Sequence, residues 1–326
     1  MKHAIRTAFA FAFASLCLCS GAHAKIVSFQ IPRAVLIGIA GMNDKGQVAG
    51  TYGDDQGGVH GFLFAAGGAV ATFDVPGATV TRVTGISAAG EVTGWYVMAM
   101  SSGSFVRAAD GSIMTFSSTA LGINAKGWIV GAVARKRNQT TAQGFLRDPT
   151  GATQHFPVPG EAHSSYSEVV NRTRMIAGVA KLESGLTQGF IRPAHGTATL
   201  FGDLHNYVDM RGINDAGTIA GAFGDQQRHY TAFVRTSDGA ITTFDGPNGT
   251  IDTEVWGINN TGTVAGAFSS DGTYYHGFLR TADGTFMPFD IKGAYRTDII
   301  AINDKGVIAG DYFVSHLGVF GFVGKP

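Results

Sequence analysis

The sequence predicts an all-β fold, specifically a seven-bladed β-propeller, and repeated patterns support this prediction. A segment similar to Gly-Ile-Asn-x-x-Gly-x-Ile-Ala-Gly occurs seven times, and successive copies lie 37 to 47 residues apart. Repeats of about 40–45 residues with four strand signals each are typical of propeller blades. We call the third residue of each copy its anchor residue, and we number the repeats by their anchors. The anchor residues are Asn43, Ser87, Asn124, Asn171, Asn214, Asn259 and Asn303.

Each repeat contains four strand signals, as the sixth repeat shows. Runs rich in β-branched and aromatic residues at 253–258, 263–268, 276–280 and 285–290 are separated by turn sequences such as Asn-Asn-Thr-Gly and Ala-Asp-Gly. This alternation predicts four short antiparallel strands. We expect the third strand to offer a phenylalanine to the neighbouring blade. These phenylalanines are Phe62, Phe105, Phe145, Phe190, Phe233, Phe278 and Phe322.

The fourth-strand pattern is offset from the others. Its phenylalanine occurs six times after the first anchor, from Phe73 to Phe289, and a seventh copy lies at 26–32, before the first repeat. The chain ends just after Phe322 without a further copy. We therefore expect the N-terminal strand to complete the last blade and close the ring, which hides an open sheet edge. An open solenoid would instead need atypical capping repeats.

The first 24 residues have the pattern of a secretory signal peptide. Two basic residues precede an apolar run at 8–19, which is too short to span a bilayer, and an Ala-x-Ala motif ends at Ala24. We predict cleavage after Ala24 and a secreted or periplasmic location. Residues 25–326 are expected to form one domain, the propeller.

Composition limits the expected partners. The chain has 24 basic and 24 acidic residues without a basic stripe, so nucleic acid is not an expected partner. Both cysteines, Cys17 and Cys19, lie in the predicted signal peptide, so the mature chain has no disulfide and no thiolate nucleophile. A lipidated cysteine is the less favoured alternative, because leucine precedes both. No other apolar run is long enough for a membrane span, and we expect a monomer.

The combined pattern resembles a known family. The succession of Gly-Ile-Asn-x-x-Gly-x-Ile-Ala-Gly, His-Gly-Phe-Leu-Arg and Thr-Phe-Asp is similar to the HAF-type extracellular repeat of bacterial exported proteins, named for a His-Ala-Phe stretch. The corresponding stretches include 60–62, 231–233 and 276–278. The resemblance covers the mature chain and implies export and a bacterial origin. It assigns no catalytic residue, because the family has no established activity.

Function is expected where the repeats differ, on the axial strands and in the loops that lead into them. Five residues before the anchor, three consecutive repeats carry Asp209, Glu254 and Asp298, while Arg82 and Tyr166 occupy this place in the second and fourth. Equivalent positions in a ring point the same way, so the three carboxylates are candidate ligands for a cation such as Ca²⁺. They could alternatively form an acid/base pair or only solvate a loop face. No other cofactor is indicated.

A second candidate group lies between the fourth and fifth repeats. It contains His163, Glu168, His205, Tyr207 and Arg211. A lyase or hydrolase that acts on a sugar polymer would need side chains of these types for proton transfer and charge stabilisation. The sequence contains no nucleophile elbow, zinc-protease motif, calcium loop or phosphate loop.

Trp256 and Arg296 join Arg82 and Tyr166 as candidate ligand contacts. Trp256 lies on an expected axial strand, three residues before its anchor, and could stack on a sugar, although tryptophans more often pack in the interior. Arg296 lies in an irregular loop before the last repeat. The basic run at 135–137 could contact an anionic polymer or simply be solvated.

The sequence therefore favours a non-catalytic binding or scaffold protein. Its expected partner is an envelope component, a polysaccharide or another protein. The alternatives are a polysaccharide lyase or hydrolase that uses the axial funnel, and a structural protein of a surface layer or matrix. A converging pocket of perturbed titratable groups would favour an enzyme.

Overall fold

The computed structural model describes residues 25–134, 141–160, 162–227, 229–247 and 249–326. These residues form 28 strands and no helix, so the predicted all-β fold is confirmed for them. Consequently, none of the described residues belongs to a helix long and apolar enough to cross a membrane. The predicted signal peptide and the basic run at 135–137 lie outside the described residues.

Four sheets each contain four antiparallel strands in chain order and correspond to the third to sixth repeats. The strands are β10 (Thr119–Ile123), β11 (Ile129–Ala134), β12 (Ala142–Arg147) and β13 (Thr153–His155); β14 (Ala162–Val170), β15 (Ile176–Leu182), β16 (Thr187–Arg192) and β17 (Thr199–His205); β18 (Tyr207–Ile213), β19 (Ile219–Gly224), β20 (Tyr230–Arg235) and β21 (Ile241–Phe244); and β22 (Asp252–Ile258), β23 (Val264–Ser269), β24 (His276–Arg280) and β25 (Phe286–Phe289).

The first two repeats share one eight-stranded sheet. A single parallel pair, Val59 with Val80, connects two four-stranded antiparallel units in it. The units are β2 (Ala34–Met42), β3 (Val48–Asp54), β4 (Val59–Phe64) and β5 (Val70–Phe73), and β6 (Val80–Ile86), β7 (Val92–Val97), β8 (Ser102–Arg107) and β9 (Ile113–Phe116).

The last sheet joins both ends of the described chain. Its strands are β1 (Lys25–Phe29), β26 (Arg296–Ile302), β27 (Ile308–Val314) and β28 (Gly318–Lys325), in the order β1-β28-β27-β26. β1 pairs with β28 from Lys25 opposite Lys325 to Phe29 opposite Gly321. The N-terminal strand thus supplies the outer strand that the C-terminal sheet lacks.

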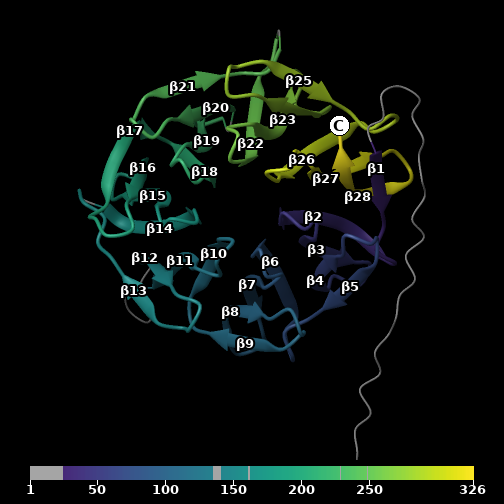
Figure 1. Ribbon diagram of the computed structural model, residues 1–326, viewed down its shortest axis with the longest axis horizontal. Helices are drawn as coiled ribbons and strands as arrows, with labels where there is room; N and C mark the ends of the chain where they lie inside the picture. The colour runs from purple at the N-terminus through teal and green to yellow at the C-terminus, as the bar shows by residue number, and fades with distance from the viewer. Residues whose placement is uncertain (1–24, 135–140, 161, 228, 248) are drawn as a thin grey trace, which may run out of the picture.

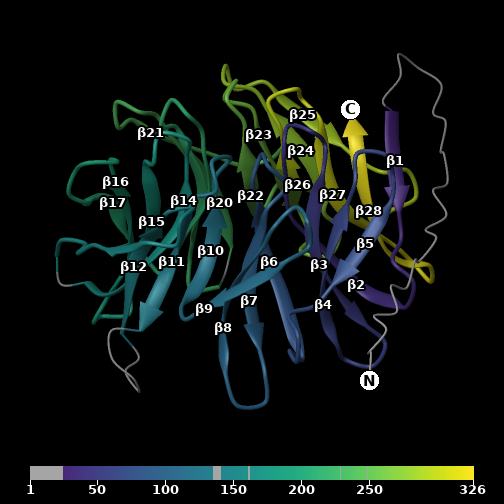
Figure 2. The same cartoon turned by 60° about the horizontal axis from the view of Figure 1, so that its bottom comes forward.

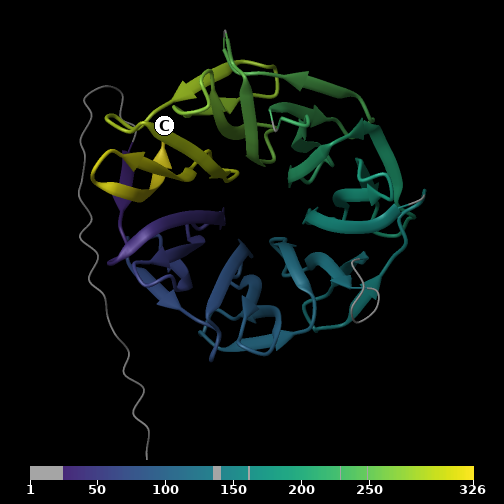
Figure 3. The same cartoon turned by 180° about the vertical axis from the view of Figure 1, so that it is seen from behind.

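The sheets stand around a central axis, as in a β-propeller (Figure 1). The first strand of each repeat lies nearest the axis, and the fourth strand, or β1 in the last sheet, lies at the periphery. The tilted view shows the sheets standing side by side around this axis (Figure 2). The view from behind shows the same arrangement of sheets around the axis (Figure 3).

Phenylalanine and glycine together fix the packing within each sheet. All seven third-strand phenylalanines are fully buried. Phe322 lies against Gly310, where an added Cβ would come within 1.9 Å of the Asp298 carbonyl oxygen and 2.8 Å of the Phe322 ring. The last glycine of the repeated segment is therefore required, because only a residue without Cβ admits both groups.

A ring of hydrogen bonds from side-chain amides joins the sheets where the first strands end. The Nδ2 of Asn171 donates to the carbonyl oxygen of Asn214, the next anchor residue, at 2.9 Å. The same type of bond, at 2.7 to 3.4 Å, connects Asn43 to Ser87, Asn124 to Asn171, Asn214 to Asn259, Asn259 to Asn303, and Asn303 to Asn43. We call these anchor residues the asparagine ring.

The asparagine ring lacks one side-chain hydrogen bond, at Ser87. Each anchor amide uses its nitrogen for the bond to the next sheet and its oxygen for the turn of its own repeat. Serine has no amide to donate, so between Ser87 and Asn124 the Ala88 N–H donates to the Ala125 carbonyl at 3.2 Å instead. The other end of each amide organises its own turn. The Oδ1 of Asn303, for example, accepts the N–H groups of the residues two and four positions later, both at 3.0 Å.

We expect Asn303→Ser to lower the free energy of unfolding by about 1–3 kcal/mol. A serine can accept a bond within the turn, as Ser87 does from the Glu91 N–H, but it cannot donate to the buried Asn43 carbonyl. Chemical denaturation would measure the loss. Ser87→Ala removes no bond between sheets and is the matched control; an equal loss in both variants would contradict the role assigned to the ring.

Candidate functional site

A cavity of about 1070 Å³ extends along the axis between the first strands. All first strands run towards the asparagine ring, so we call this end of the cavity the anchor end. Because the strands are antiparallel, the loops into the first strands and the loops between second and third strands surround the other end. We call it the loop end.

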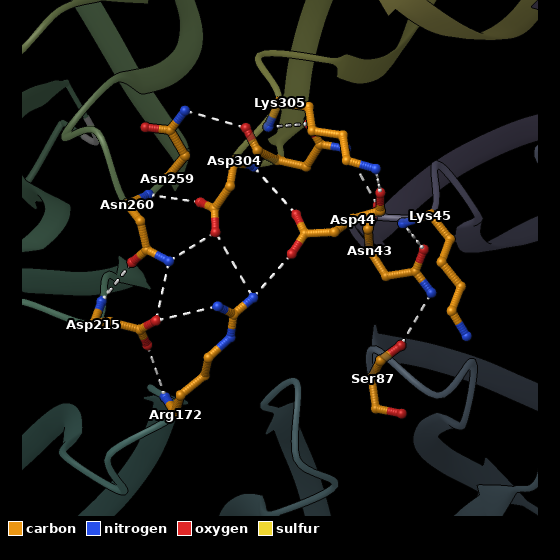
Figure 4. Close-up of polar contacts among 11 residues, drawn as sticks. Asn43, Asp44, Lys45, Ser87, Arg172, Asp215, Asn259, Asn260, Asp304 and Lys305 are labelled. Carbon is orange, nitrogen blue, oxygen red and sulfur yellow. Dashed lines mark hydrogen bonds and ion pairs between the residues drawn. The ribbon is translucent and has the colours of Figure 1, made fainter.

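At the anchor end, one arginine lies among three aspartates (Figure 4). Arg172 directly follows an anchor residue, and its guanidinium nitrogens lie 2.9 Å from an oxygen of Asp44, 3.4 Å from Asp215 and 3.7 Å from Asp304. The aspartates also directly follow anchor residues, in the first, fifth and seventh repeats. One cation thus compensates part of the charge of three carboxylates from different sheets, and its side chain lies across this end of the cavity.

Asn260 occupies the same place in the sixth repeat and extends this network. Its Nδ2 donates to Asp215 at 3.0 Å and to Asp304 at 2.8 Å. Its Oδ1 accepts the Asp215 N–H at 2.7 Å. This network was not predicted from the sequence, in which the three aspartates are separated by up to 260 residues. The available signal is a single arginine at a position where three of the equivalent residues are aspartates.

Nearer the loop end, Glu168, Arg211 and Trp256 share one level, three residues before their anchors, and line the cavity. The Arg211 guanidinium lies 4.6 Å from the Trp256 ring centroid and 2.8 Å from Asp209. Glu168 accepts the Met210 N–H at 2.9 Å. Burial, and then the charge of Asp209, raise the pKa of Glu168 to about 8, against the opposing effects of the Met210 N–H and Arg211.

Four carboxylates lie around Arg296 and Tyr275, two of them in the cavity lining, and we call them the acidic wall. Arg296 donates from Nε to Asp298 at 2.5 Å, and its terminal nitrogen lies 3.8 Å from Glu254. Its guanidinium lies 4.1 Å from the Tyr275 ring centroid, and the Tyr275 hydroxyl donates to Asp252 at 2.8 Å. The acidic wall consists of Asp252, Glu254, Asp298 and Asp311.

The charge of the acidic wall is incompletely compensated. Burial raises the pKa of Asp298, although Arg296 opposes it. Burial, and then the charge of Asp298, hold the pKa of Asp311 well above its usual value; the two residues face each other across β26 and β27. Burial, and then Asp252, raise the pKa of Glu254 to about 7. Among the described residues, Asp298 Oδ1, Glu254 Oε2 and Trp256 Nε1 are buried without a hydrogen-bond partner.

Three of the four predicted ligand contacts line the cavity. Trp256 and Arg296 do so near the acidic wall. Arg82 also lines it, exposed and 5.8 Å from the Trp95 ring centroid. Tyr166 is half-buried in β14 and, among the residues that the structure describes, is not one that lines the cavity.

Of the five predicted catalytic candidates, the structure brings only two together. Glu168 and Arg211 adjoin in the axial cavity. Tyr207 lines a second cavity of about 370 Å³. His205 stacks on Phe223 with 4.2 Å between ring centroids, and burial lowers its pKa. His163 is half-buried near the start of β14. Catalysis by these residues stays a prediction.

The three predicted metal ligands each lie beside an arginine. Asp209 pairs with Arg211, while Glu254 and Asp298 adjoin Arg296. Within the described part of the chain, no group of three or more His, Cys, Asp or Glu residues is placed to hold a metal ion. The Ca²⁺ site therefore gains no support from this arrangement and stays a prediction.

Comparison with solved structures identifies the fold as a β-propeller. A catalytically inactive virginiamycin B lyase from Staphylococcus aureus, determined with quinupristin, has a TM-score of 0.62 and 16% identity over 93% of this chain and 100% of that one. The β-propeller domain of the Trilobed protease from Pyrococcus furiosus has a TM-score of 0.64 and 10% identity over 89% and 95%. No family model and no curated protein matches the chain. Identities this low establish the fold alone.

We expect Arg172→Met to destabilise the protein by about 1 kcal/mol at low ionic strength, because three aspartates would converge without a cation. The loss should shrink towards 1 M salt, where the Debye length is only about 3 Å. Thermal unfolding at two salt concentrations would measure it. Arg174→Met is the control, since Arg174 stacks on Trp128 and contacts no aspartate of this network. A loss that is the same at both salt concentrations would contradict the prediction.

Glu168 should make stability depend on pH. Because its folded-state pKa is raised, the folded chain binds this proton more tightly than the unfolded chain does. Its contribution to stability is therefore complete below the ordinary glutamate pKa and is lost as pH rises towards about 8. We expect the melting temperature of Glu168→Gln to fall less than that of the wild type between acidic and mildly alkaline pH. If the melting temperatures of the two proteins change with pH to the same extent, the prediction is wrong.

Proposed function

We propose that this chain is an exported, non-catalytic binding protein whose ligand enters the loop end of the axial cavity. In this proposal residues 25–326 form a single seven-bladed propeller, closed by β1. The pairing of β1 with β28 and the bond from Asn303 to Asn43 support closure. The five four-stranded sheets and the two units of the eight-stranded sheet support the blade count. The Ala24 cleavage motif supports export.

The single observation that carries the binding role is the asymmetry of the cavity. At the anchor end, Arg172 is satisfied by carboxylates of the chain itself. At the loop end, Arg211 and Arg296 are also paired with carboxylates and lie over aromatic rings, but Asp298 Oδ1, Glu254 Oε2 and Trp256 Nε1 are buried there without hydrogen-bond partners. Fixed polar groups in a concave site reduce the entropy lost on binding. The expected partner is an envelope component, a polysaccharide or another protein.

A second function, a polysaccharide lyase or hydrolase, is favoured by one observation. The pKa of Glu168, about 8, suits a group that exchanges protons near neutral pH, and Arg211 lies beside it. Depolymerisation of anionic and neutral polysaccharides by the wild type and by Glu168→Gln tests this function. Activity that the substitution abolishes would replace the non-catalytic proposal.

We expect Gly38→Trp to block the site without unfolding the chain. Gly38 lines the cavity, and a Cβ added to it would meet no atom closer than 4.0 Å. A thermal-shift screen with peptidoglycan fragments, polysaccharides and peptides should find ligands that raise the melting temperature of the wild type but bind the variant about tenfold or more weakly, about 1.4 kcal/mol. Ala71→Trp, on the outer strand β5, is the control. Ligands that bind both variants equally would place binding elsewhere and refute the proposal.

A further inference from the structure

We infer that the ligand of the axial cavity is a polypeptide segment in which a lysine or arginine stands between apolar residues, and that its basic side chain enters the cavity beside the acidic wall. The inference rests on the proposed function, because it names the ligand class of the same site. It is carried by two independent features of the loop end: a buried acceptor that lacks a donor, and an uneven distribution of exposed apolar side chains.

The first feature is the acidic wall, whose charge is only partly compensated. Arg296 contacts Asp298 and Glu254, and Arg211 acts on Glu254 from a greater distance, so two guanidinium groups serve four carboxylates, one of them already paired with Asp209. The side chain of Asp298 is 4% exposed and belongs to the cavity lining, yet its Oδ1 has no partner among the described residues. A buried acceptor without a donor costs free energy. Because this oxygen is enclosed, a ligand acts on it through charge, and a positive group in the cavity beside Asp298 stabilises the buried carboxylate.

The arrangement suits an organic cation better than a metal ion or an anion. No group of His, Cys, Asp or Glu in the described residues is placed to hold a metal. Tyr295 and Phe313 line the same part of the cavity with ring centroids 6.1 Å apart, and aromatic faces attract ammonium and guanidinium groups. Leu36 and Ile300 also line it and can contact the apolar stem of a lysine or arginine. An anionic ligand would instead face the uncompensated carboxylates.

The second feature is an accumulation of exposed apolar side chains around the same part of the loop end. Of the twelve large apolar residues exposed in the described chain, nine lie at the loop end, in loops or at strand ends. Six of these nine belong to the sixth, seventh and first repeats, and we call them the apolar rim. They are Val35, Leu36, Ile251, Tyr274, Tyr295 and Leu317, exposed by 38 to 67%.

The apolar rim adjoins the acidic wall. The sheets of the sixth, seventh and first repeats are neighbours in the ring, and β26 contacts both β22 and β2. The Tyr275 N–H donates to the Tyr295 carbonyl at 3.3 Å, which ties the loop that carries Tyr274 to the start of β26. Clustered exposed apolar groups mark interaction sites. A polypeptide can cover them with apolar side chains while a basic residue reaches the wall, whereas a polysaccharide offers mainly hydroxyl groups.

The binding experiment uses the full chain and a fluorescent peptide, acetyl-Leu-Val-Lys-Val-Leu amide, in an anisotropy titration. Three matched peptides serve as controls. In the first, norleucine takes the place of the lysine; in the second, glutamate does; in the third, serine takes the place of the four flanking residues. We expect the lysine peptide to bind at least about tenfold more tightly than the norleucine peptide, a difference of about 1.4 kcal/mol. The glutamate and serine peptides should bind more weakly still.

Variants of the protein test whether the acidic wall and the apolar rim each contribute to binding. Glu254→Gln alone, and together with Asp298→Asn, should reduce the preference for lysine over norleucine; Asp225→Asn, on the loop end of the fifth repeat, is the control. Leu317→Ser, in the apolar rim, should weaken the lysine and norleucine peptides about equally, whereas Met100→Ser, at an exposed apolar residue of the second repeat, should weaken neither. Melting curves identify any variant that fails to fold, and Glu254→Gln retains the shape of the wall.

The outcomes separate this inference from the proposed function. If the four peptides bind equally, or none binds at millimolar concentration, the inference is wrong. If a polysaccharide then raises the melting temperature of the wild type but not of Gly38→Trp, the proposed function stands with another ligand class. If no ligand distinguishes the wild type from Gly38→Trp, the proposed function fails as well.

Discussion

The anchor asparagine is the interaction on which the rest of the structure depends. Its oxygen organises the turn between the first and second strands, and its nitrogen donates to the backbone of the next sheet. One side chain therefore couples the local conformation of a repeat to the position of its neighbour. Aspartate cannot donate and serine cannot reach, so the amide is the side chain that serves both roles. The bond from Asn303 to Asn43 extends the coupling across the point where the chain begins and ends.

This coupling brings residues that are far apart in the sequence to the axis. The residue after each anchor lies at the anchor end, which explains how Arg172 meets Asp44, 128 positions away. The network needs different residues at equivalent positions, because seven identical charges around one axis would repel each other. Symmetry in the backbone therefore coexists with asymmetry in the side chains. The residues of the proposed binding site lie at these asymmetric positions.

Much of the fold can be predicted from the sequence, and less of the site. Repeat spacing and turn composition predict the all-β fold, and the displaced fourth-strand pattern anticipates the pairing of β1 with β28. Trp256, Arg296 and Arg82 line the cavity, and the ligand contact predicted for them stays a prediction. Their ion pairs and ring contacts cannot be predicted from the sequence, because these contacts depend on which side chains of neighbouring sheets lie at the same level along the axis. Arg296, for instance, lies between Glu254 and Asp298 instead of leaving those carboxylates free for a metal.

The acidic wall costs stability that the fold does not require. Asp311 accepts the Ile39 N–H of the next sheet. At the equivalent place in the first repeat, Thr51 accepts the Val83 N–H at 2.9 Å with a neutral hydroxyl. At the position of Asp298 the first repeat has Gly38 and the third has Thr119. Neutral residues thus meet the same structural demand elsewhere in the ring. The buried acidic residues of the seventh repeat thus have no structural task that neutral residues could not perform, and the proposed cationic ligand would give them one, because Arg296 compensates only part of their charge.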